Sequence, residues 1–264
     1  GGSALIEEKL IVPSSDGQLY SYNLDQFTKL WEFSTSNKIW TTPVLKDTIV
    51  YFGSLDQNLY ALDTVDGSLI WDEPFKTDAA IVSKPLILDQ TVYIGSFDGI
   101  FYGIDVETGL EKARFSEAGG WYWGGAITDG ETIFVGSLNG NIYALNKIDL
   151  TLKWNIDVQS SIVGSPVILN EKLVFSSTDG RLRTVNLSDG QNMRQCKLDI
   201  KLKDIKFNEH GVSQPIVMQS AAGWYVGQVQ KDDFFLVIPY DRLSDYYSLK
   251  DARNLLKKQK EVWK

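Results

Sequence analysis

The sequence predicts an all-β fold assembled from repeated four-stranded sheets. Nearly the same hairpin phrase returns five times along the 264 residues, at intervals of 40 to 42 residues. Each copy places a turn dipeptide between alternating apolar runs, which is typical of a β-hairpin. The turns are Asp16-Gly17, Asp56-Gln57, Asp98-Gly99, Asn139-Gly140 and Asp179-Gly180. A four-stranded sheet of this size cannot bury both faces alone, so several must stack around an axis, which predicts a β-propeller.

The first strand of each repeat opens on a small or polar residue followed by proline. Proline lacks an N–H donor and is tolerated on an edge strand, so we expect this strand to be the innermost one, beside the axis. The pairs are Thr42-Pro43, Lys84-Pro85, Ser165-Pro166 and Gln214-Pro215, with Gly125-Ala126 in the remaining copy.

The second and third strands flank the repeated turn. A Gly-Ser pair precedes the turn in three copies and indicates close packing of the backbone at Gly53, Gly95 and Gly136. The turn residues themselves, among them Asp98, Asn139 and Asp179, are explained by turn chemistry. A tyrosine follows four residues after the first turn residue in four copies, and Arg183 replaces it in the fifth.

The fourth strand carries a tryptophan in three copies, at Trp31, Trp71 and Trp154. An indole buries more area than most other side chains, so we interpret these residues as wedges between neighbouring sheets on the outermost strands.

The strand count predicts about six blades over residues 9–241, with incomplete units at both ends. Residues 1–8 begin with Gly1-Gly2-Ser3 and are interpreted as a cloning remnant and lead-in without a strand. Within the tail, residues 242–264, the stretch 248–264 has apolar residues at helical spacing and six basic against two acidic side chains. They predict a short amphipathic helix, which lies either on a membrane or partner or on the acidic propeller itself.

Composition limits the chemistry of the chain. The net charge of −8 argues against nucleic acid as a partner. The single Cys196 and single His210 leave no disulfide framework, histidine-based metal cluster or Ser-His triad. No pair of carboxylates has a spacing that marks it as catalytic, so we expect no catalytic residues, no metal site and no cofactor.

The repeat Tyr/Val-x-Gly-Ser-x-Asp-Gly-x-Leu-Tyr-Ala-Leu-Asp, then Thr-Gly, then Leu-x-Trp, resembles the PQQ-like (pyrroloquinoline-quinone-type) propeller repeat. It is carried by YFGSLDQNLYALDTVDGSLIW (51–71), YIGSFDGIFYGIDVETGLEKA (93–113) and FVGSLNGNIYALNKIDLTLKW (134–154). The resemblance implies a propeller fold and is closest in character to the non-catalytic branch that scaffolds outer-membrane protein assembly.

That resemblance implies a protein-interaction scaffold outside the cytoplasm, in the periplasm or at the cell surface, with protein partners of the envelope. The alternatives are a quinone- or small-ligand-binding propeller related to the quinone dehydrogenases, or a lumenal-type sensor domain. Quinone enzymes of the family resemble one another in carrying an adjacent cysteine pair, which one cysteine cannot provide.

One stretch within the propeller repeats, residues 117–127, breaks the pattern, and it is a candidate interaction site together with Trp40 and Lys84. Trp121-Tyr122-Trp123 stands where other copies have Ala80-Ile81-Val82 or Ser161-Ile162-Val163, and Trp40 matches Trp123 in the first copy. Tryptophan and tyrosine are favoured at interface hot spots, although packing between blades is the alternative explanation. Lys84 is the one charge at the pre-proline position, and we expect it to point toward the channel.

Overall fold

The computed structural model of the chain describes residues 2–197, 218–219, 224–229 and 234–239, and these form six antiparallel sheets. Five sheets have four strands and the sixth has three, which confirms the predicted all-β propeller architecture. Within this described part, no helix is long and apolar enough to cross a membrane. The predicted helix over 242–264 lies outside the described residues.

The first five sheets are called blades 1 to 5. Blade 1 consists of β1 (Ala4–Ile6), β2 (Lys9–Pro13), β3 (Gln18–Asn23) and β4 (Thr28–Ser34). Blade 2 consists of β5 (Val44–Lys46), β6 (Ile49–Gly53), β7 (Asn58–Asp63) and β8 (Phe75–Lys76). Blade 3 consists of β9 (Leu86–Leu88), β10 (Thr91–Gly95), β11 (Phe101–Asp105) and β12 (Glu111–Phe115).

Blade 4 consists of β13 (Ile127–Thr128), β14 (Thr132–Gly136), β15 (Asn141–Asn146) and β16 (Leu152–Asp157). Blade 5 consists of β17 (Val167–Leu169), β18 (Lys172–Ser177), β19 (Arg181–Asn186) and β20 (Arg194–Lys197). The sixth sheet consists of β21 (Met218–Gln219), β22 (Trp224–Val229) and β23 (Phe234–Pro239).

The N-terminal prediction was wrong in one respect. Residues 1–8 were expected to contain no strand, but Ala4–Ile6 forms β1, which pairs with β2 and completes blade 1. This segment lacks the proline that opens the other first strands. It still supplies the required apolar residue, because Ala4 is buried in the cluster between blades 1 and 2.

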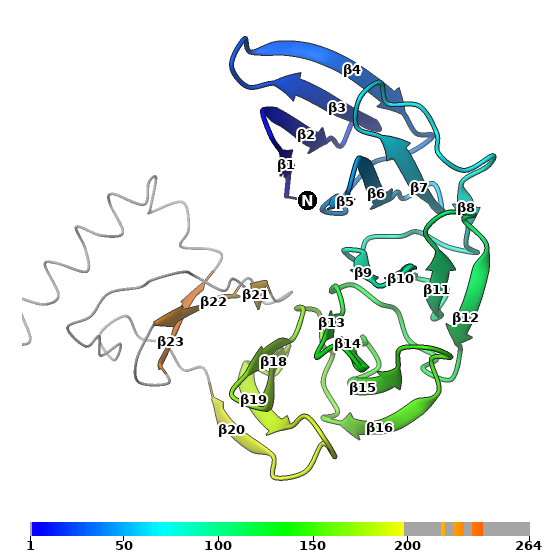
Figure 1. Cartoon of the computed structure of the whole chain (residues 1–264). Helices are drawn as coiled ribbons and strands as arrows, with labels where there is room; N and C mark the ends of the chain where they lie inside the picture. Colours follow the sequence, from blue (N-terminus) through cyan, green and yellow to red (C-terminus); the bar gives the residue numbers. More distant parts are fainter. Residues whose placement is uncertain (1, 198–217, 220–223, 230–233, 240–264) are drawn as a thin grey trace, which may run out of the picture.

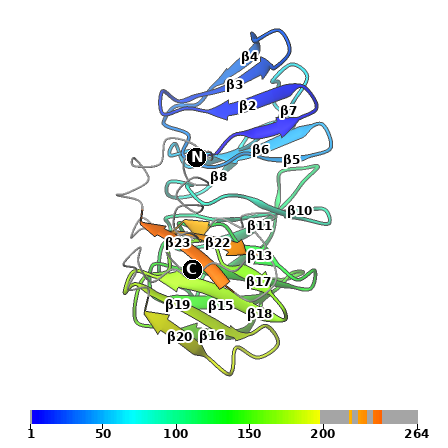
Figure 2. The same cartoon turned by 90° about the vertical axis from the view of Figure 1, so that its left-hand side faces the viewer.

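The blades follow one another along an arc in chain order (Figure 1; side view, Figure 2). The first strand of each blade lies nearest the centre of the arc, and the fourth lies at the periphery. Neighbouring first strands contact each other, as β5 does with β1 and β9. Pro43, Pro85 and Pro166 precede β5, β9 and β17, which agrees with the predicted inner position of these strands.

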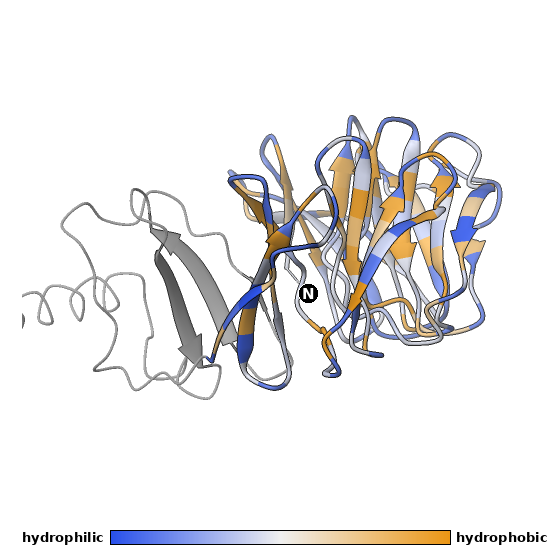
Figure 3. Ribbon diagram, turned by 90° about the horizontal axis from the view of Figure 1, so that it is seen from below, coloured by the Kyte–Doolittle hydropathy of each residue, from blue (hydrophilic) through white to orange (hydrophobic). Residues whose placement is uncertain are grey.

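The core lies between the blades. Four buried clusters each join the face of one blade to the next, and the strand interiors are apolar while the connecting loops are more polar (Figure 3). Between blades 2 and 3, for example, Tyr51 and Leu59 pack against Val92 and Ile104. The fold is therefore a series of interfaces between adjacent blades, as expected for a repeat protein.

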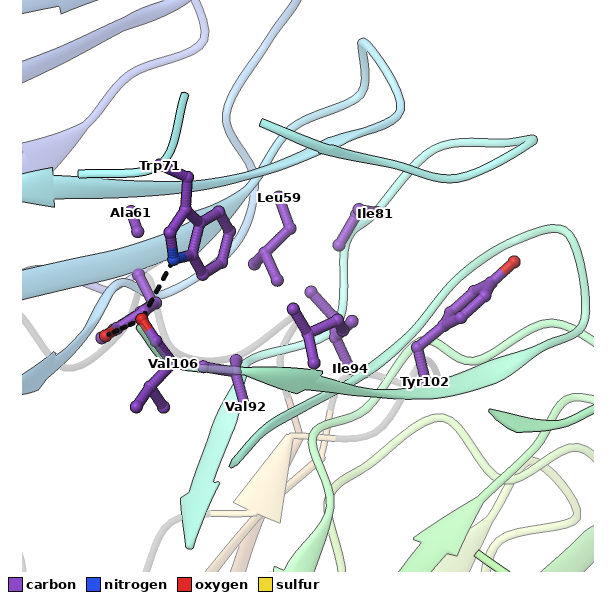
Figure 4. Close-up of a cluster of buried hydrophobic side chains, with 10 residues drawn as sticks. Leu59, Ala61, Trp71, Ile81, Val92, Ile94, Tyr102 and Val106 are labelled. Carbon is purple, nitrogen blue, oxygen red and sulfur yellow. Dashed lines mark hydrogen bonds between the residues drawn. The ribbon is translucent and has the colours of Figure 1, made fainter. Parts of the chain in front are cut away.

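The repeated tryptophan packs against the next blade and donates a hydrogen bond to it at three interfaces. The Trp71 Nε1 donates a hydrogen bond to the Val106 carbonyl of the next blade at 3.0 Å (Figure 4). Its ring also covers Gly109, where an added Cβ would lie 2.6 Å from the indole. Two further pairs repeat this contact: Trp31 covers Gly67 and bonds to Thr64, and Trp154 covers Gly190 and bonds to Leu187.

The interface between blades 3 and 4 lacks the repeated tryptophan and the glycine that it covers. Ala113 occupies the tryptophan position, and Leu150 occupies the position of the covered glycine. Leu150 is 1% exposed and belongs to the buried cluster against which Ala113 packs. The Tyr93 hydroxyl donates to the Lys147 carbonyl, the equivalent of Val106. Leu150 therefore fills the volume of the indole, and the Tyr93 bond is the counterpart of the bond from the Tyr51 hydroxyl to Val106 between blades 2 and 3.

Blade 2 departs from the predicted outer strand. Trp71 lies in a bend rather than a strand, and β8 is restricted to Phe75–Lys76. Pro74 explains the interruption, because proline lacks the N–H donor and restricts the residue before it. Trp71 is nevertheless 3% exposed, so its packing role does not depend on a regular strand.

Candidate functional site

One edge of the blade array, here called the hairpin rim, carries the loops between the second and third strands and the linkers that enter the next blade. The hairpin loops bind the preceding linkers through the backbone. Leu138 N donates to the Trp121 carbonyl at 2.9 Å, and Phe97 N donates to the Ala80 carbonyl at 3.0 Å. Each linker is thereby fixed against the hairpin of the following blade.

The aspartates of the hairpin loops are engaged in turn structure. The Asp98 carboxylate accepts a hydrogen bond from Ile100 N at 2.9 Å and from the Tyr102 hydroxyl at 2.8 Å. Burial, followed by the bond to Asp98, raises the pKa of Tyr102 above its ordinary value of 10.0. Asp56 binds Asn58 N and Tyr60 in the same way.

The fourth and fifth copies keep the loop but change the partner. Asn139 Nδ2 donates to the Tyr143 hydroxyl at 2.7 Å. In blade 5 the Arg183 Nη2 donates to Asp179 Oδ2 at 2.6 Å, and Arg183 is 3% exposed. The Arg183 guanidinium holds the pKa of Asp179 well below its usual range. These residues therefore act in the turn and not as a solvent-facing acid or base.

The repeated glycines lie where the next linker crosses the blade. A Cβ on Gly53 would lie 2.1 Å from Ile81 Cγ2, and one on Gly95 would lie 2.2 Å from Tyr122 Cβ. At Gly136 it would lie 2.2 Å from Ile162 Cγ2. No other residue fits such a distance without displacement of its neighbours.

Tyr122 was named with Trp121 and Trp123 as a candidate interaction residue, with packing between blades as the alternative, and for Tyr122 the structure shows packing between blades. Its side chain is 0% exposed and packs beside Gly95 and Phe101 in the cluster between blades 3 and 4. The reason is the repeat itself, since Tyr122 stands at the position of Ile81 and Ile162, both of which are buried. Its hydroxyl has no hydrogen-bond partner within the described part of the chain.

The tryptophans on either side of Tyr122 point outward. Trp121 is 53% exposed and Trp123 is 42% exposed. The Trp121 ring stacks on Phe97 with centroids 4.9 Å apart and planes 16° apart. The Trp123 ring lies 5.4 Å from Phe97 at an angle of 33°. These three side chains, called the rim aromatic cluster, form a half-exposed surface on blades 3 and 4.

Phe97 is the member of this cluster that the sequence did not single out. It occupies the hairpin position held by Leu55 and Leu138 in other copies. The signal was therefore an aromatic residue at a usually aliphatic position, next to the linker that holds two tryptophans.

Trp40 occupies the Trp123 position in the linker between blades 1 and 2 and is 41% exposed. The Lys38 Nζ lies over its ring, 5.9 Å from the centroid. No aromatic pair within the described residues joins Trp40 to Trp121 or Trp123. Trp40 and the rim aromatic cluster are therefore two separate exposed sites.

Lys84 lies just before β9, the first strand of blade 3. A Cβ added to Gly125 would lie 3.0 Å from Lys84 Cβ, and Gly125 N donates to Ser165 Oγ at 2.8 Å. Lys84, Gly125 and Ser165 are equivalent positions of successive repeats, so these contacts run around the inner side of the arc. The side chain of Lys84 is exposed.

The described residues contain no cluster of three or more histidine, cysteine, aspartate or glutamate side chains suited to a metal ion. A hollow of about 400 Å³ lies on blade 5, and Lys172, Val174 and Thr184 are among its lining residues. The Lys172 side chain there donates to Asn186 Oδ1, its partner residue on the neighbouring strand. The exposed aromatic side chains of the hairpin rim are the stronger candidate site.

Comparison with known proteins agrees with the repeat pattern and with the fold. The family model described as outer membrane protein assembly factor BamB, of the PQQ-like repeat type, matches residues 15–119 and 113–195. The chain belongs to this family. The match runs from the turn before β3 of blade 1 into β20 of blade 5 and includes the hairpin rim.

Two curated relatives carry the same name. The BamB of Yersinia pestis is 29% identical over 99 residues, which are 38% of this chain and 24% of the relative. The BamB of Salmonella typhimurium strain LT2 is 25% identical over 182 residues, which are 69% of this chain and 35% of the relative. The chain thus spans about a quarter to a third of the length of these relatives.

Three solved structures share the fold. BamB from Moraxella catarrhalis matches with a TM-score of 0.60 and 18% identity, over 87% of this chain and 84% of that one. The designed Ika8 protein gives 0.68 and 16%, over 89% and 69%. Quinohemoprotein alcohol dehydrogenase from Comamonas testosteroni gives 0.63 and 16%, over 74% and 42%. At these identities the likeness concerns the fold alone.

Proposed function

We propose that this chain is a non-catalytic protein-interaction module of an extracytoplasmic, envelope-associated complex, and that the rim aromatic cluster is part of its contact surface. The curated relatives are named outer membrane protein assembly factors, which supports a role in an assembly of proteins. Two further candidate contact residues are Trp40, on the hairpin rim, and Lys84, on the inner side of the arc.

The main observation in support of this contact surface is the exposure of Trp121 and Trp123. Large apolar side chains grouped on a surface mark interaction sites more often than scattered ones do. Tryptophan is also enriched among the residues that contribute most to binding energy. The buried interfaces do not need these two rings, because Tyr122 between them already fills the core position.

The test is a cross-linking capture from the envelope fraction of the native host. The intact chain is compared with the variant Trp121→Ala/Trp123→Ala and with Phe27→Ala. Phe27 is 84% exposed in the turn between β3 and β4, away from the hairpin rim, and serves as the matched control. We expect a defined set of proteins with the intact chain and with Phe27→Ala.

Loss of that set with the double tryptophan variant, at unchanged melting temperature, supports the proposal. Capture that is the same for all three forms would show that the rim aromatic cluster is not the contact surface. Absence of any specific protein with the intact chain would contradict the interaction module itself.

A further inference from the structure

Two linkers of the hairpin rim place a tryptophan at the same repeat position, but their surroundings differ. In the linker between blades 1 and 2, residue 38 is a lysine whose ammonium lies over the Trp40 ring. In the linker between blades 3 and 4, the equivalent of Lys38 is a second tryptophan, Trp121. No cation lies over Trp121 or Trp123 within the described residues, where three such contacts occur elsewhere.

The geometry of the rim aromatic cluster leaves ring faces available. Trp121 and Phe97 are stacked, so one indole face is covered and the other contributes to the 53% exposure of Trp121. Trp123 is inclined by 33° against Phe97 and is also exposed. The face of an indole carries negative electrostatic potential and attracts ammonium and guanidinium groups.

Three acidic residues lie close to the rim aromatic cluster along the chain or through a hydrogen bond to its loop. Glu117 lies in the same linker as Trp121 and is exposed, and Asp98 directly follows Phe97. Asp78 N donates to Asp98 Oδ2 at 3.2 Å, which places the exposed Asp78 beside this loop. None of the ion pairs between described residues involves these three carboxylates. Arg114 on β12 is paired with Glu111.

We propose that the rim aromatic cluster binds a positively charged side chain, arginine or lysine, presented by an extended peptide segment of a protein partner. The cation lies over the exposed indole faces, and Asp78 and Glu117 supply the complementary charge. Arginine fits best because its planar guanidinium stacks on an aromatic face. This inference rests on the proposed interaction function and specifies the chemistry of the partner.

A peptide selection tests the inference without knowledge of the partner. Random nonapeptides displayed on phage are selected on the full chain, on Trp121→Ala/Trp123→Ala and on Phe27→Ala. We expect enrichment of arginine and lysine with the full chain, loss of that enrichment with the double variant, and its retention with Phe27→Ala. Phe27 is the control because it is an exposed aromatic side chain in the turn between β3 and β4, away from the hairpin rim.

The best selected peptide is then labelled and titrated by fluorescence anisotropy. Replacing its arginine by citrulline, which keeps the shape and removes the charge, is expected to weaken binding about three- to tenfold. The variant Asp78→Asn/Glu117→Gln is expected to weaken binding to a similar extent and to reduce its dependence on salt.

Three results would overturn the inference: selected peptides that are apolar or acidic, enrichment that survives the double variant, or an unchanged affinity for the citrulline peptide. Absence of any peptide that depends on the two tryptophans counts against it as well. The proposed function is judged separately by the envelope capture. If capture needs Trp121 and Trp123 while the peptides are not cationic, the interaction module stands and the cation-binding inference fails.

Discussion

At the scale of single residues, the positions that repeat are defined by what they contact in the next blade. Tyr51 shows this well, because its hydroxyl donates to the Val106 carbonyl that also accepts the Trp71 hydrogen bond. Tyr51 is 0% exposed. Its burial, followed by the nearby charges of Asp47 and Asp105, raises its pKa from 10.0 to about 12.

Tyr51→Phe is therefore expected to affect stability in two ways. At neutral pH it removes one hydrogen bond between blades and costs about 1 kcal/mol. At alkaline pH the free energy of unfolding is expected to decrease less steeply with rising pH in Tyr51→Phe than in the parent. The unfolded chain releases the tyrosine proton near pH 10, while the folded chain retains it until about pH 12. The contribution of Tyr51 is complete below pH 10 and is lost as the pH rises through 12.

The measurement is urea unfolding of the parent and Tyr51→Phe at pH 7 and at pH 11. Tyr22→Phe serves as the control, since the Tyr22 hydroxyl makes no hydrogen bond among those of the described residues. Equal loss of stability between the two pH values in parent and Tyr51→Phe would show that Tyr51 does not carry this dependence.

At the scale of the blade, the interfaces show that different residues can fill one volume. Trp71 with Gly109 and Ala113 with Leu150 are alternative solutions at equivalent positions. Leu150 has a φ of 57°, the left-handed conformation that glycine adopts in the other turns. The leucine therefore accepts an unfavourable backbone conformation while it fills the space left by the missing indole.

The exchange of these two residues can be tested by a double-mutant cycle. Leu150→Gly alone removes a buried side chain and is expected to cost about 2 to 5 kcal/mol. Ala113→Trp alone brings an indole against Leu150 and is expected to cost about 1 to 3 kcal/mol. The double variant Ala113→Trp/Leu150→Gly recreates the contact seen at Trp71, so we expect it to recover most of the parent stability.

Chemical denaturation of the four proteins gives the coupling energy directly. Trp71→Ala/Gly109→Leu, which makes the reverse exchange between blades 2 and 3, is the matched comparison. Additive effects in the first cycle would contradict the view that the two residues replace each other in one volume.

The repeat also explains what the sequence could and could not predict. Proline before the first strands and tryptophan near the fourth strands predicted which strands of a blade lie inside and outside, because each residue has one dominant structural cause. The exposure of Trp121 and burial of Tyr122 follow from register with Ala80 and Ile81, not from their aromatic character. Phe97 joined the site only in three dimensions, since its hairpin lies 24 residues before Trp121 in the chain.

At the scale of the whole molecule, blades 1 to 5 form a chain of interfaces in which each blade contacts its neighbours. Stability in such a molecule is close to a sum of blade and interface contributions. A weakened interface should then open locally and leave distant blades closed. Trp31 and Trp154 allow the comparison, because they seal the interfaces of blades 1–2 and 4–5 through the same contact.

Trp31→Ala is expected to weaken its interface by about 3 kcal/mol, which corresponds to roughly 100-fold faster amide exchange where local opening governs exchange. Hydrogen–deuterium exchange with mass spectrometry should show the increase in β2, β3 and β6, whereas β14 and β15 keep the parent rates. Trp154→Ala should give the reverse pattern, with faster exchange in β15 and β18. A uniform increase across all blades in either variant would mean that the blades unfold as one cooperative unit, so that the tryptophans set the stability of the whole molecule rather than of single interfaces.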